Sequence, residues 1–188
     1  MVEYHVFKSK IKDTARVSGK VSIGSFTEIE DFVKIHNTSK NNSIDIGKRC
    51  KIKQGAVLKS YGGFIKIGDR VSIGENCNIA GHGGVLIGDY TIIAGLCYIS
   101  SANHIFSNFE PIRFQGETSK GISIGKNVWI GGMSMILDGV KIGDGAIIGA
   151  GSIVTKDMPE YSVCYGTPCE PIKIRKKEDL NEICYCEL

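Results

Sequence analysis

A six-residue repeat of branched aliphatic residues constrains this chain more than any other feature of its sequence. Isoleucine, leucine or valine recurs at every sixth position in blocks. The blocks run over 11–35, 46–58, 67–79, 87–99 and 124–154. A period of six places successive aliphatic residues on different faces of a 3.6-residue helix, which excludes an amphipathic α-helix.

Two further positions of each hexad carry a pattern. The residue four places after the aliphatic residue is small, as at Thr27, Cys50 and Ser134. It stands two places before the next aliphatic residue, so both side chains point inward from one short strand and the residue between them points outward. Glycine often follows the aliphatic residue directly, where we expect it to permit a sharp corner that a Cβ would make costly.

This pattern predicts an all-β fold, a single-stranded parallel β-helix. Three short strands make one triangular coil of about 18 residues, and coils stack through parallel hydrogen bonds about 4.8 Å apart. We expect six to seven coils over residues 1–170 and a short C-terminal tail over 171–188. The register breaks after Ile35, Leu58, Ile79 and Ile99. Loops should emerge there, the longest being an excursion loop over about residues 106–121.

Composition limits the partners and the cellular location that we expect for the protein. The net charge of +3 is too weak to indicate a nucleic-acid partner. The sequence has no apolar run of the about 18 residues needed to span a membrane, and its first residues lack the layout of a secretion signal. We therefore expect a cytoplasmic protein without membrane insertion. Cys50, Cys77 and Cys97 occupy the small inward position and are interpreted as core residues, not nucleophiles.

Particular segments resemble a known family, the hexapeptide-repeat acyltransferases, and most closely its sugar O-acetyltransferase branch. They are Asn103-His104, the run from Gly121 to Gly131 containing Trp129, the run from Ile142 to Asp157, and Gly166-Thr167-Pro168. The resemblance covers about residues 65–175. It implies a left-handed helix, a homotrimer, and active sites between neighbouring subunits that the excursion loop covers. It also implies acetyl-CoA as co-substrate, with a small sugar or lipid-linked sugar as acceptor and no metal.

The resemblance makes His104 the catalytic base. Its position just before Ile105, which keeps the six-residue register, predicts an outward-facing ring at the mouth of the longest loop. An imidazole with an ordinary pKa near 6.5 can accept a proton from a hydroxyl at neutral pH. The family often has Asp before the base where this chain has Asn103, so another group must orient the ring. Glu110 and Glu117 are both candidates, and the sequence does not choose between them.

Substrate contacts are predicted for His82 and Asn103. His82 lies in a corner insertion about one coil before His104, so it can face the same cleft and bind the acceptor. An ordinary loop histidine is an equally good interpretation of His82. Backbone N–H groups near Gly131 or Gly149 are candidates for stabilising the oxyanion of the reaction.

Cofactor contacts are predicted along the last regular hexads. Trp129 falls in an outward position, where it could anchor a trimer interface or pack against the pantetheine arm of CoA. Glycines could let that arm approach the backbone, and cations could bind the CoA phosphates. The predicted set comprises Trp129, Gly131, Gly132, Gly149, Thr155, Lys156, Lys173 and Arg175. The cations near the C-terminus are alternatively a solvated tail.

Other functions fit parts of the sequence. An N-acetyltransferase of an amino sugar, or a drug-inactivating acetyltransferase, could carry the same residues. A zinc enzyme of the γ-carbonic-anhydrase kind needs three histidine ligands, and the chain has four histidines in all with Phe109 where a ligand is required. A non-catalytic binding β-helix would leave His104, Trp129 and the loop unexplained. We expect a role in surface polysaccharide biosynthesis from the resemblance alone.

Overall fold

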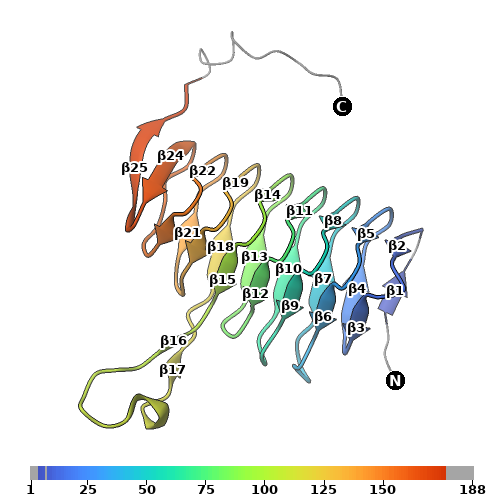
Figure 1. Cartoon of the computed structure of the whole chain (residues 1–188), viewed down its shortest axis with the longest axis horizontal. Helices are drawn as coiled ribbons and strands as arrows, with labels where there is room; N and C mark the ends of the chain where they lie inside the picture. Colours follow the sequence, from blue (N-terminus) through green and yellow to red (C-terminus); the bar gives the residue numbers. More distant parts are fainter. Residues whose placement is uncertain (1–3, 7, 177–188) are drawn as a thin grey trace.

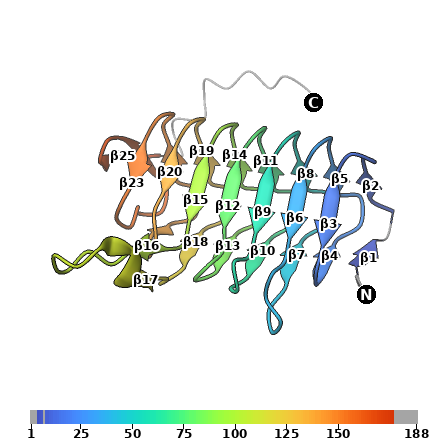
Figure 2. The same ribbon diagram turned by 60° about the horizontal axis from the view of Figure 1, so that its bottom comes forward.

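A computed structural model describes residues 4–6 and 8–176, and it shows a three-sided prism of short parallel strands (Figures 1 and 2). No α-helix occurs among these residues. The chain forms a left-handed parallel β-helix of about seven coils, as predicted. Each wall of the prism is one parallel sheet, and we call the walls sheets A, B and C in the order in which the chain visits them.

The strands of each wall are separated by one coil of chain. Sheet A contains β1 (Tyr4–Val6), β4 (Val21–Ile23), β7 (Ile44–Ile46), β10 (Ile65–Ile67), β13 (Val85–Ile87), β18 (Ile122–Ile124) and β21 (Lys141–Ile142). Sheet B contains β2 (Lys10–Ile11), β5 (Glu28–Ile29), β8 (Lys51–Ile52), β11 (Ser72–Ile73), β14 (Ile92–Ile93), β19 (Trp129–Ile130), β22 (Ile147–Ile148), β24 (Ser162–Gly166) and β25 (Cys169–Ile174). Sheet C contains β3 (Arg16–Ser18), β6 (Lys34–His36), β9 (Val57–Lys59), β12 (Asn78–Ala80), β15 (Tyr98–Ser100), β20 (Met135–Ile136) and β23 (Ile153–Val154).

The repeat accounts for the core. Each aliphatic residue pairs with the aliphatic residue of the next coil, as Ile46, Ile67 and Ile87 do in sheet A. These side chains are buried from Ile23 onward, while Ile11 and Val17 in the first coil are partly buried. Like residues stacked in every coil give a continuous apolar interior, which is the source of stability in a solenoid.

The small inward residues are buried as predicted. Cys50, Cys77 and Cys97 are at most 2% exposed, which confirms them as core residues. Burial raises the pKa of the Cys50 thiol, so this group is not poised as a nucleophile. Thr27 has a polar side chain in the same position, and its hydroxyl donates to the Gly47 carbonyl of the next coil at 2.8 Å.

The glycines that follow the aliphatic residues are required for a reason that differs from the predicted corner. A Cβ on Gly74 would lie 2.4 Å from the backbone nitrogen of Gly95 in the next coil, so close stacking excludes it. The residue with positive φ comes three places after the aliphatic residue instead. Non-glycine residues often occupy it, including Phe26 (φ 62°) and Leu96 (φ 63°). The sharp turn is therefore made at this later position.

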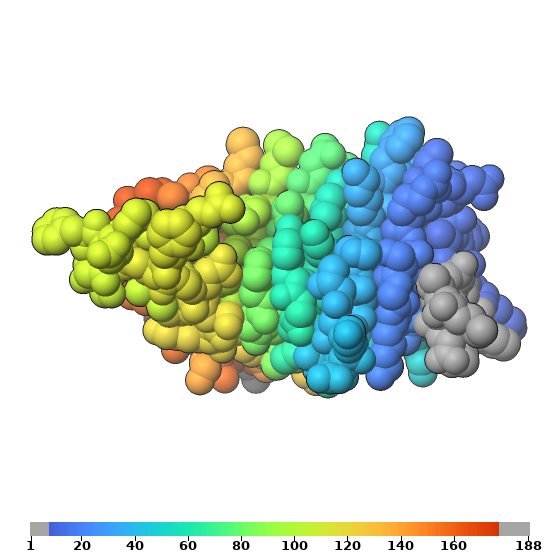
Figure 3. Space-filling view, turned by 90° about the horizontal axis from the view of Figure 1, so that it is seen from below, coloured from blue at the N-terminus to red at the C-terminus, as the bar shows by residue number. Residues whose placement is uncertain are grey.

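All four register breaks fall at one corner of the prism, between sheets C and A. They follow β6, β9, β12 and β15, which are the C-sheet strands of successive coils. The last break carries the longest excursion. Its neck is a small antiparallel pair of β16 (Asn103–His104) and β17 (Glu117–Thr118), and its tip holds a 3-10 turn at Ile112–Phe114. Seen from below, the loop extends beyond the body of the prism (Figure 3).

The C-terminal end departs from the parallel pattern. β24 pairs parallel with β22, but β25 turns back and runs antiparallel to β24. The boundary that we drew at residue 170 falls inside β25, because this strand continues to Ile174. The part of the predicted tail beyond residue 176 lies outside the described residues.

Candidate active site

A cavity of about 320 Å³ lies beside the neck of the excursion loop at the corner between sheets C and A. It brings together the predicted residues His82, Asn103 and His104. The complete lining is His82, Tyr98, Ser100, Ala102, Asn103, His104, Glu117 and Leu137. These residues come from three successive coils and from both strands of the loop neck.

The loop neck places a carboxylate opposite the predicted base. β16 and β17 are antiparallel, and their register pairs His104 with Glu117. The His104 Nδ1 and the Glu117 Oε1 are 3.7 Å apart, and both side chains are exposed to solvent, at 63% and 47%. Glu110 lies away from this cavity, on the loop, where its backbone N–H donates to the Asn108 side chain. Of the two carboxylates left open by the sequence, Glu117 is the one placed to orient the ring.

This pair has the geometry of a base and its orienting group. A carboxylate at Nδ1 favours the tautomer with the proton on that nitrogen, and it leaves Nε2 free to accept one. The separation of 3.7 Å is longer than a hydrogen bond, and such contacts tighten when a ligand excludes water. The ring can therefore take a proton from a hydroxyl bound in the cavity.

His82 is held in place by an aromatic neighbour that the sequence did not single out. The rings of His82 and Tyr61 are stacked with centroids 4.2 Å apart and an interplanar angle of 5°. The Lys59 ammonium lies 4.3 Å from the centroid of the Tyr61 ring. The His82 Nδ1 is buried without a hydrogen-bond partner among the described residues. Tyr61 lies in the corner insertion one coil before that of His82. This matching position in the sequence could have suggested that the two rings meet.

Asp138 binds the backbone at the C-terminal side of the excursion loop. This residue was not predicted from the sequence. Its carboxylate accepts from the backbone N–H of Lys120 at 2.8 Å and of Gly121 at 3.0 Å. It also accepts from the Thr118 hydroxyl at 3.2 Å. Because Thr118 belongs to β17, this carboxylate ties the strand that carries Glu117 to the next coil.

The predicted cofactor residues on the B side of the prism lie apart from His104. Trp129 stands on the outer face of sheet B and is 52% exposed. Gly131 and Gly132 follow at the corner between sheets B and C, with Gly149 one coil further. The N–H groups of Gly131 and Gly149 donate to carbonyls of the adjacent coil at 2.7 Å each. These two N–H groups are therefore used by the stack and cannot also bind an oxyanion.

The remaining predicted cofactor residues are scattered over other corners. Thr155 and Lys156 follow β23, and the Lys156 ammonium forms an ion pair with Glu170 at 2.6 Å. Lys173 is exposed on β25. The Arg175 guanidinium donates to the Gly145 carbonyl at 2.7 Å, so it ties the segment after β25 to the corner between sheets A and B. None of these residues lines the cavity at His104.

Exposed apolar side chains surround Trp129. They form what we call the apolar corner, which wraps from sheet B to sheet C over two successive coils. Its members are Ile92, Leu96, Tyr98, Trp129, Met133 and Met135, each at least 41% exposed. The excursion loop is a second apolar surface, with Phe106, Phe109, Ile112 and Phe114 all exposed. Patches of this kind on a monomer commonly mark interaction surfaces.

Neither a metal-ion site nor a membrane-spanning helix was found among the described residues. No group of three or more His, Cys, Asp or Glu side chains there could hold a metal ion. The same residues include no helix with the length and apolar character to span a bilayer.

The repeats define the class of protein that the chain resembles. Residues 121–156 match the family described as bacterial transferase hexapeptide (six repeats). This segment runs from the end of the loop through β23, and it includes Trp129 and Lys156. The predicted resemblance to hexapeptide-repeat transferases is confirmed.

Individual relatives are named acetyltransferases. The chain is 44% identical over 118 residues to a galactoside O-acetyltransferase of Escherichia coli, which covers 62% of this chain and 57% of that protein. It is 30% identical over 145 residues to a probable acetyltransferase of Mycobacterium tuberculosis, covering 77% of this chain and 48% of that protein. The chain thus spans about half the length of the curated relatives it matches.

Solved structures share the fold. A galactoside acetyltransferase in complex with coenzyme A is similar with a TM-score of 0.50 and 32% identity, covering 76% of this chain and 63% of that one. A point mutant of the N-acyltransferase AntD from Bacillus cereus, in complex with dTDP and coenzyme A, is similar with a TM-score of 0.64. It is 24% identical, covers 93% of this chain and 86% of that one, and supports the fold alone.

Proposed function

We propose that this protein is an acetyl-CoA-dependent O-acetyltransferase that acetylates a sugar hydroxyl with His104 as general base. The observation that carries the proposal is the His104–Glu117 pair at the mouth of a cavity that also presents His82 and Asn103. The relatives named acetyltransferases, and the coenzyme A bound in a structural relative, agree with it.

The reaction needs no covalent enzyme intermediate. The acceptor hydroxyl gives its proton to the His104 Nε2 as its oxygen attacks the thioester carbonyl carbon. Glu117 stabilises the imidazolium that forms. When the tetrahedral intermediate collapses, the C–S bond breaks and His104 returns the proton to the departing thiolate. The products are the acetyl ester and free CoA. General-base assistance of this kind is worth about 10²–10⁴ in rate.

We further propose that the working unit is a homotrimer with sites shared between subunits. His104 lies at the corner between sheets C and A, whereas Trp129 projects from sheet B. One chain therefore does not gather the predicted catalytic and cofactor residues, but two chains in contact can. The apolar corner and the apolar loop are different surfaces, so their contact is heterologous and repeats into a closed ring.

The proposed acceptor is a small sugar or a lipid-linked sugar, and the cellular role is proposed from the family resemblance. We place the activity in the cytoplasm, in the biosynthesis of surface polysaccharide, on the resemblance described above.

The test is acetyl transfer by the purified protein, followed as release of free CoA thiol. His104→Ala should lower kcat by about 10²–10⁴, because the proton acceptor is lost. His36→Ala is the matched control, since His36 is an exposed histidine at the end of a C-sheet strand outside the cavity. Galactosides and maltose offer only hydroxyls, whereas glucosamine adds an amine, so an ester or an amide in the glucosamine product separates O-transfer from N-transfer. Full activity in His104→Ala, or no thioester cleavage with any acceptor, would contradict the proposal.

A further inference from the structure

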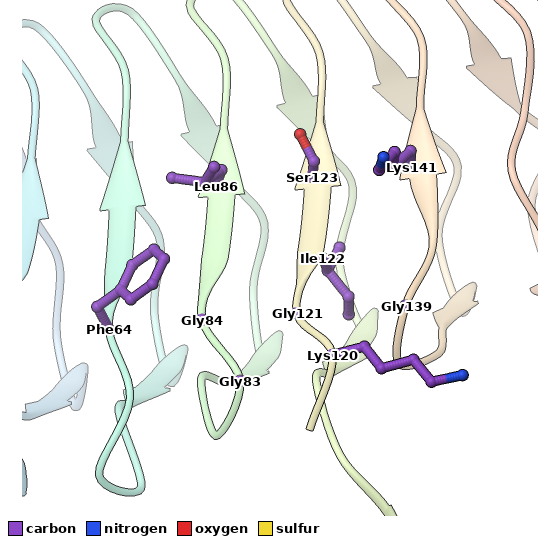
Figure 4. Close-up of a pocket in the computed structure, with 10 residues that line it drawn as sticks. All are labelled: Phe64, Gly83, Gly84, Leu86, Lys120, Gly121, Ile122, Ser123, Gly139 and Lys141. Carbon is purple, nitrogen blue, oxygen red and sulfur yellow. The ribbon is translucent and has the colours of Figure 1, made fainter. Parts of the chain in front are cut away.

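A second cavity, of about 330 Å³, opens on sheet A across the corner from His104. Figure 4 shows Phe64 and Leu86 on one side of it and Lys120 and Lys141 on the other. Ser123 stands between Leu86 and Lys141 in the strand register. Its side chain is shorter than those of both neighbours, so the sheet surface is hollow at this point.

The two cavities share a single ridge of backbone. In each of three successive coils, one residue at the corner lines the His104 cavity, and a residue one to four places later in the sequence lines the second cavity. His82 is followed in this way by Gly83 and Gly84, Glu117 by Lys120 and Gly121, and Leu137 by Gly139. The ridge is low, because its residues on the second side are mostly glycine.

Close packing keeps the ridge free of side chains. A Cβ on Gly84 would lie 2.4 Å from the Phe64 ring, and one on Gly83 would lie 2.6 Å from the backbone of Ser119 and Gly121. Gly121 and Gly139 have φ values of 92° and 85°, which other residues rarely adopt. A bound molecule can therefore extend over the ridge from one cavity to the other.

The second cavity has a positive character. The ammonium groups of Lys120 and Lys141 form no ion pair within the described residues. Asp138 and Asp157 do contact these two lysines, but through the backbone. Each carboxylate accepts a hydrogen bond from the backbone N–H of its lysine, at 2.8 Å in both cases. The Lys120 side chain lies across Gly139 with its ammonium at the outer rim of the cavity, and Lys141 projects from the strand beside Ser123 (Figure 4). Positive groups at the rim of a hollow attract a compact anion such as phosphate.

We propose that this second cavity is a subsite for a phosphate or diphosphate group on the acceptor. The inference rests on the proposed function, because it requires the acceptor hydroxyl at His104. The sugar ring occupies the first cavity, and the phosphate crosses the ridge to Lys120 and Lys141. Phe64 and Leu86 then offer an apolar wall to whatever follows the phosphate. The acceptor class is a sugar phosphate or a nucleoside-diphosphate sugar.

Calorimetric titration tests the subsite without any turnover. The probes are inorganic pyrophosphate, galactose 1-phosphate, UDP-galactose and methyl galactoside, added to protein free of acetyl-CoA. The Lys120→Ala/Lys141→Ala double variant should bind the three phosphorylated probes at least about tenfold more weakly than the wild type. Its affinity for methyl galactoside should not change. The control is Lys34→Ala/Lys51→Ala, which removes two exposed strand lysines that also lack ion pairs among the described residues.

Phe64→Ala distinguishes the two sources of phosphate. If the acceptor is a nucleoside-diphosphate sugar whose base reaches the apolar wall, the affinity for UDP-galactose should fall while that for galactose 1-phosphate stays unchanged. If both affinities stay unchanged, the acceptor is a simple sugar phosphate. Leu86→Ala makes the same comparison at the other half of the wall.

The inference is overturned if no phosphorylated probe binds the wild type, or if the lysine variant binds these probes as tightly as the wild type. Acetyl transfer to a neutral sugar that persists in that case leaves the proposed function standing. Phosphate binding that depends on the two lysines, in a protein that cleaves no thioester, would instead contradict the proposed function alone.

Discussion

At the scale of single residues, the site depends on the strand pairing that sets Glu117 opposite His104. We predict that Glu117→Gln lowers kcat by about tenfold, because a neutral amide stabilises the imidazolium less than a carboxylate does. Glu110→Gln, on the same loop but outside the cavity, should leave kcat unchanged. Steady-state kinetics with a saturating acceptor decides between them, and equal loss in both variants would refute the assignment.

Tyr61 should act as a positioning residue through its stack on His82. We predict that Tyr61→Ala raises the KM for the acceptor by several-fold with little change in kcat, because His82 loses its support while His104 is untouched. Tyr61→Phe keeps the ring and should restore the wild-type KM. A fall in kcat without a rise in KM would argue against this role.

The sequence identified some of these residues and missed others for physical reasons. The sequence predicted His82 because it lies in a corner insertion, and it predicted His104 with Asn103 chiefly because the family resemblance places the base there. Glu117 could not be preferred to Glu110, since the choice depends on how the loop folds back on itself. The Tyr61–His82 contact was missed because corner insertions of different length disturb the regular offset between coils.

At the scale of the element, the spacing between coils restricts the side chains that each hexad can carry. We predict that Gly74→Ala lowers the free energy of unfolding by about 3 kcal/mol, because its Cβ would meet the Gly95 backbone at 2.4 Å. In Gly95→Ala the nearest atom is 3.2 Å away, so this control should change stability by less than about 1 kcal/mol. Urea denaturation at one fixed protein concentration makes the comparison. Equal stability of the two variants would show that the coils can separate to admit a methyl group.

The strands and the buried positions were predictable, because the aliphatic and the small residues recur at fixed places in each hexad. The geometry of the turns was not predictable in this way. The left-handed residue lies three places after the aliphatic residue, where the chain has Phe26, Arg49, Tyr90 and Leu96 among others. No single residue type marks that position, so the sequence directed attention to the glycines instead.

At the scale of the whole molecule, the separation of His104 from Trp129 makes a direct test of the shared site possible. Trp129→Ala and His104→Ala should each be inactive alone. When the two variants are co-expressed in equal amounts with different tags and assemble at random, about one quarter of all sites receive both intact residues. We therefore predict that activity recovers to about that fraction of wild type. Mixed assemblies without activity would place both residues in one subunit's site.

The parallel prism was predictable at this scale, and its closing strand was not. A repeat predicts that the next coil resembles the last one, but after β23 the hexads stop. Cys169 is then buried against the last described coil by an antiparallel hairpin, which departs from the parallel pairing of the three walls. Contacts between copies lie outside any repeat, which is why the trimer came from resemblance alone.

That reversed final strand gives the molecule a polarity. A stack of parallel strands ends in unsatisfied backbone donors and acceptors, and another chain could in principle join there and continue the column indefinitely. By turning back on itself, β25 covers the exposed edge of β24 and presents a direction of chain that no further coil can follow. On sheet B, a further coil therefore cannot add to β24 in the parallel register of the stack, because β25 already occupies that edge in the opposite direction.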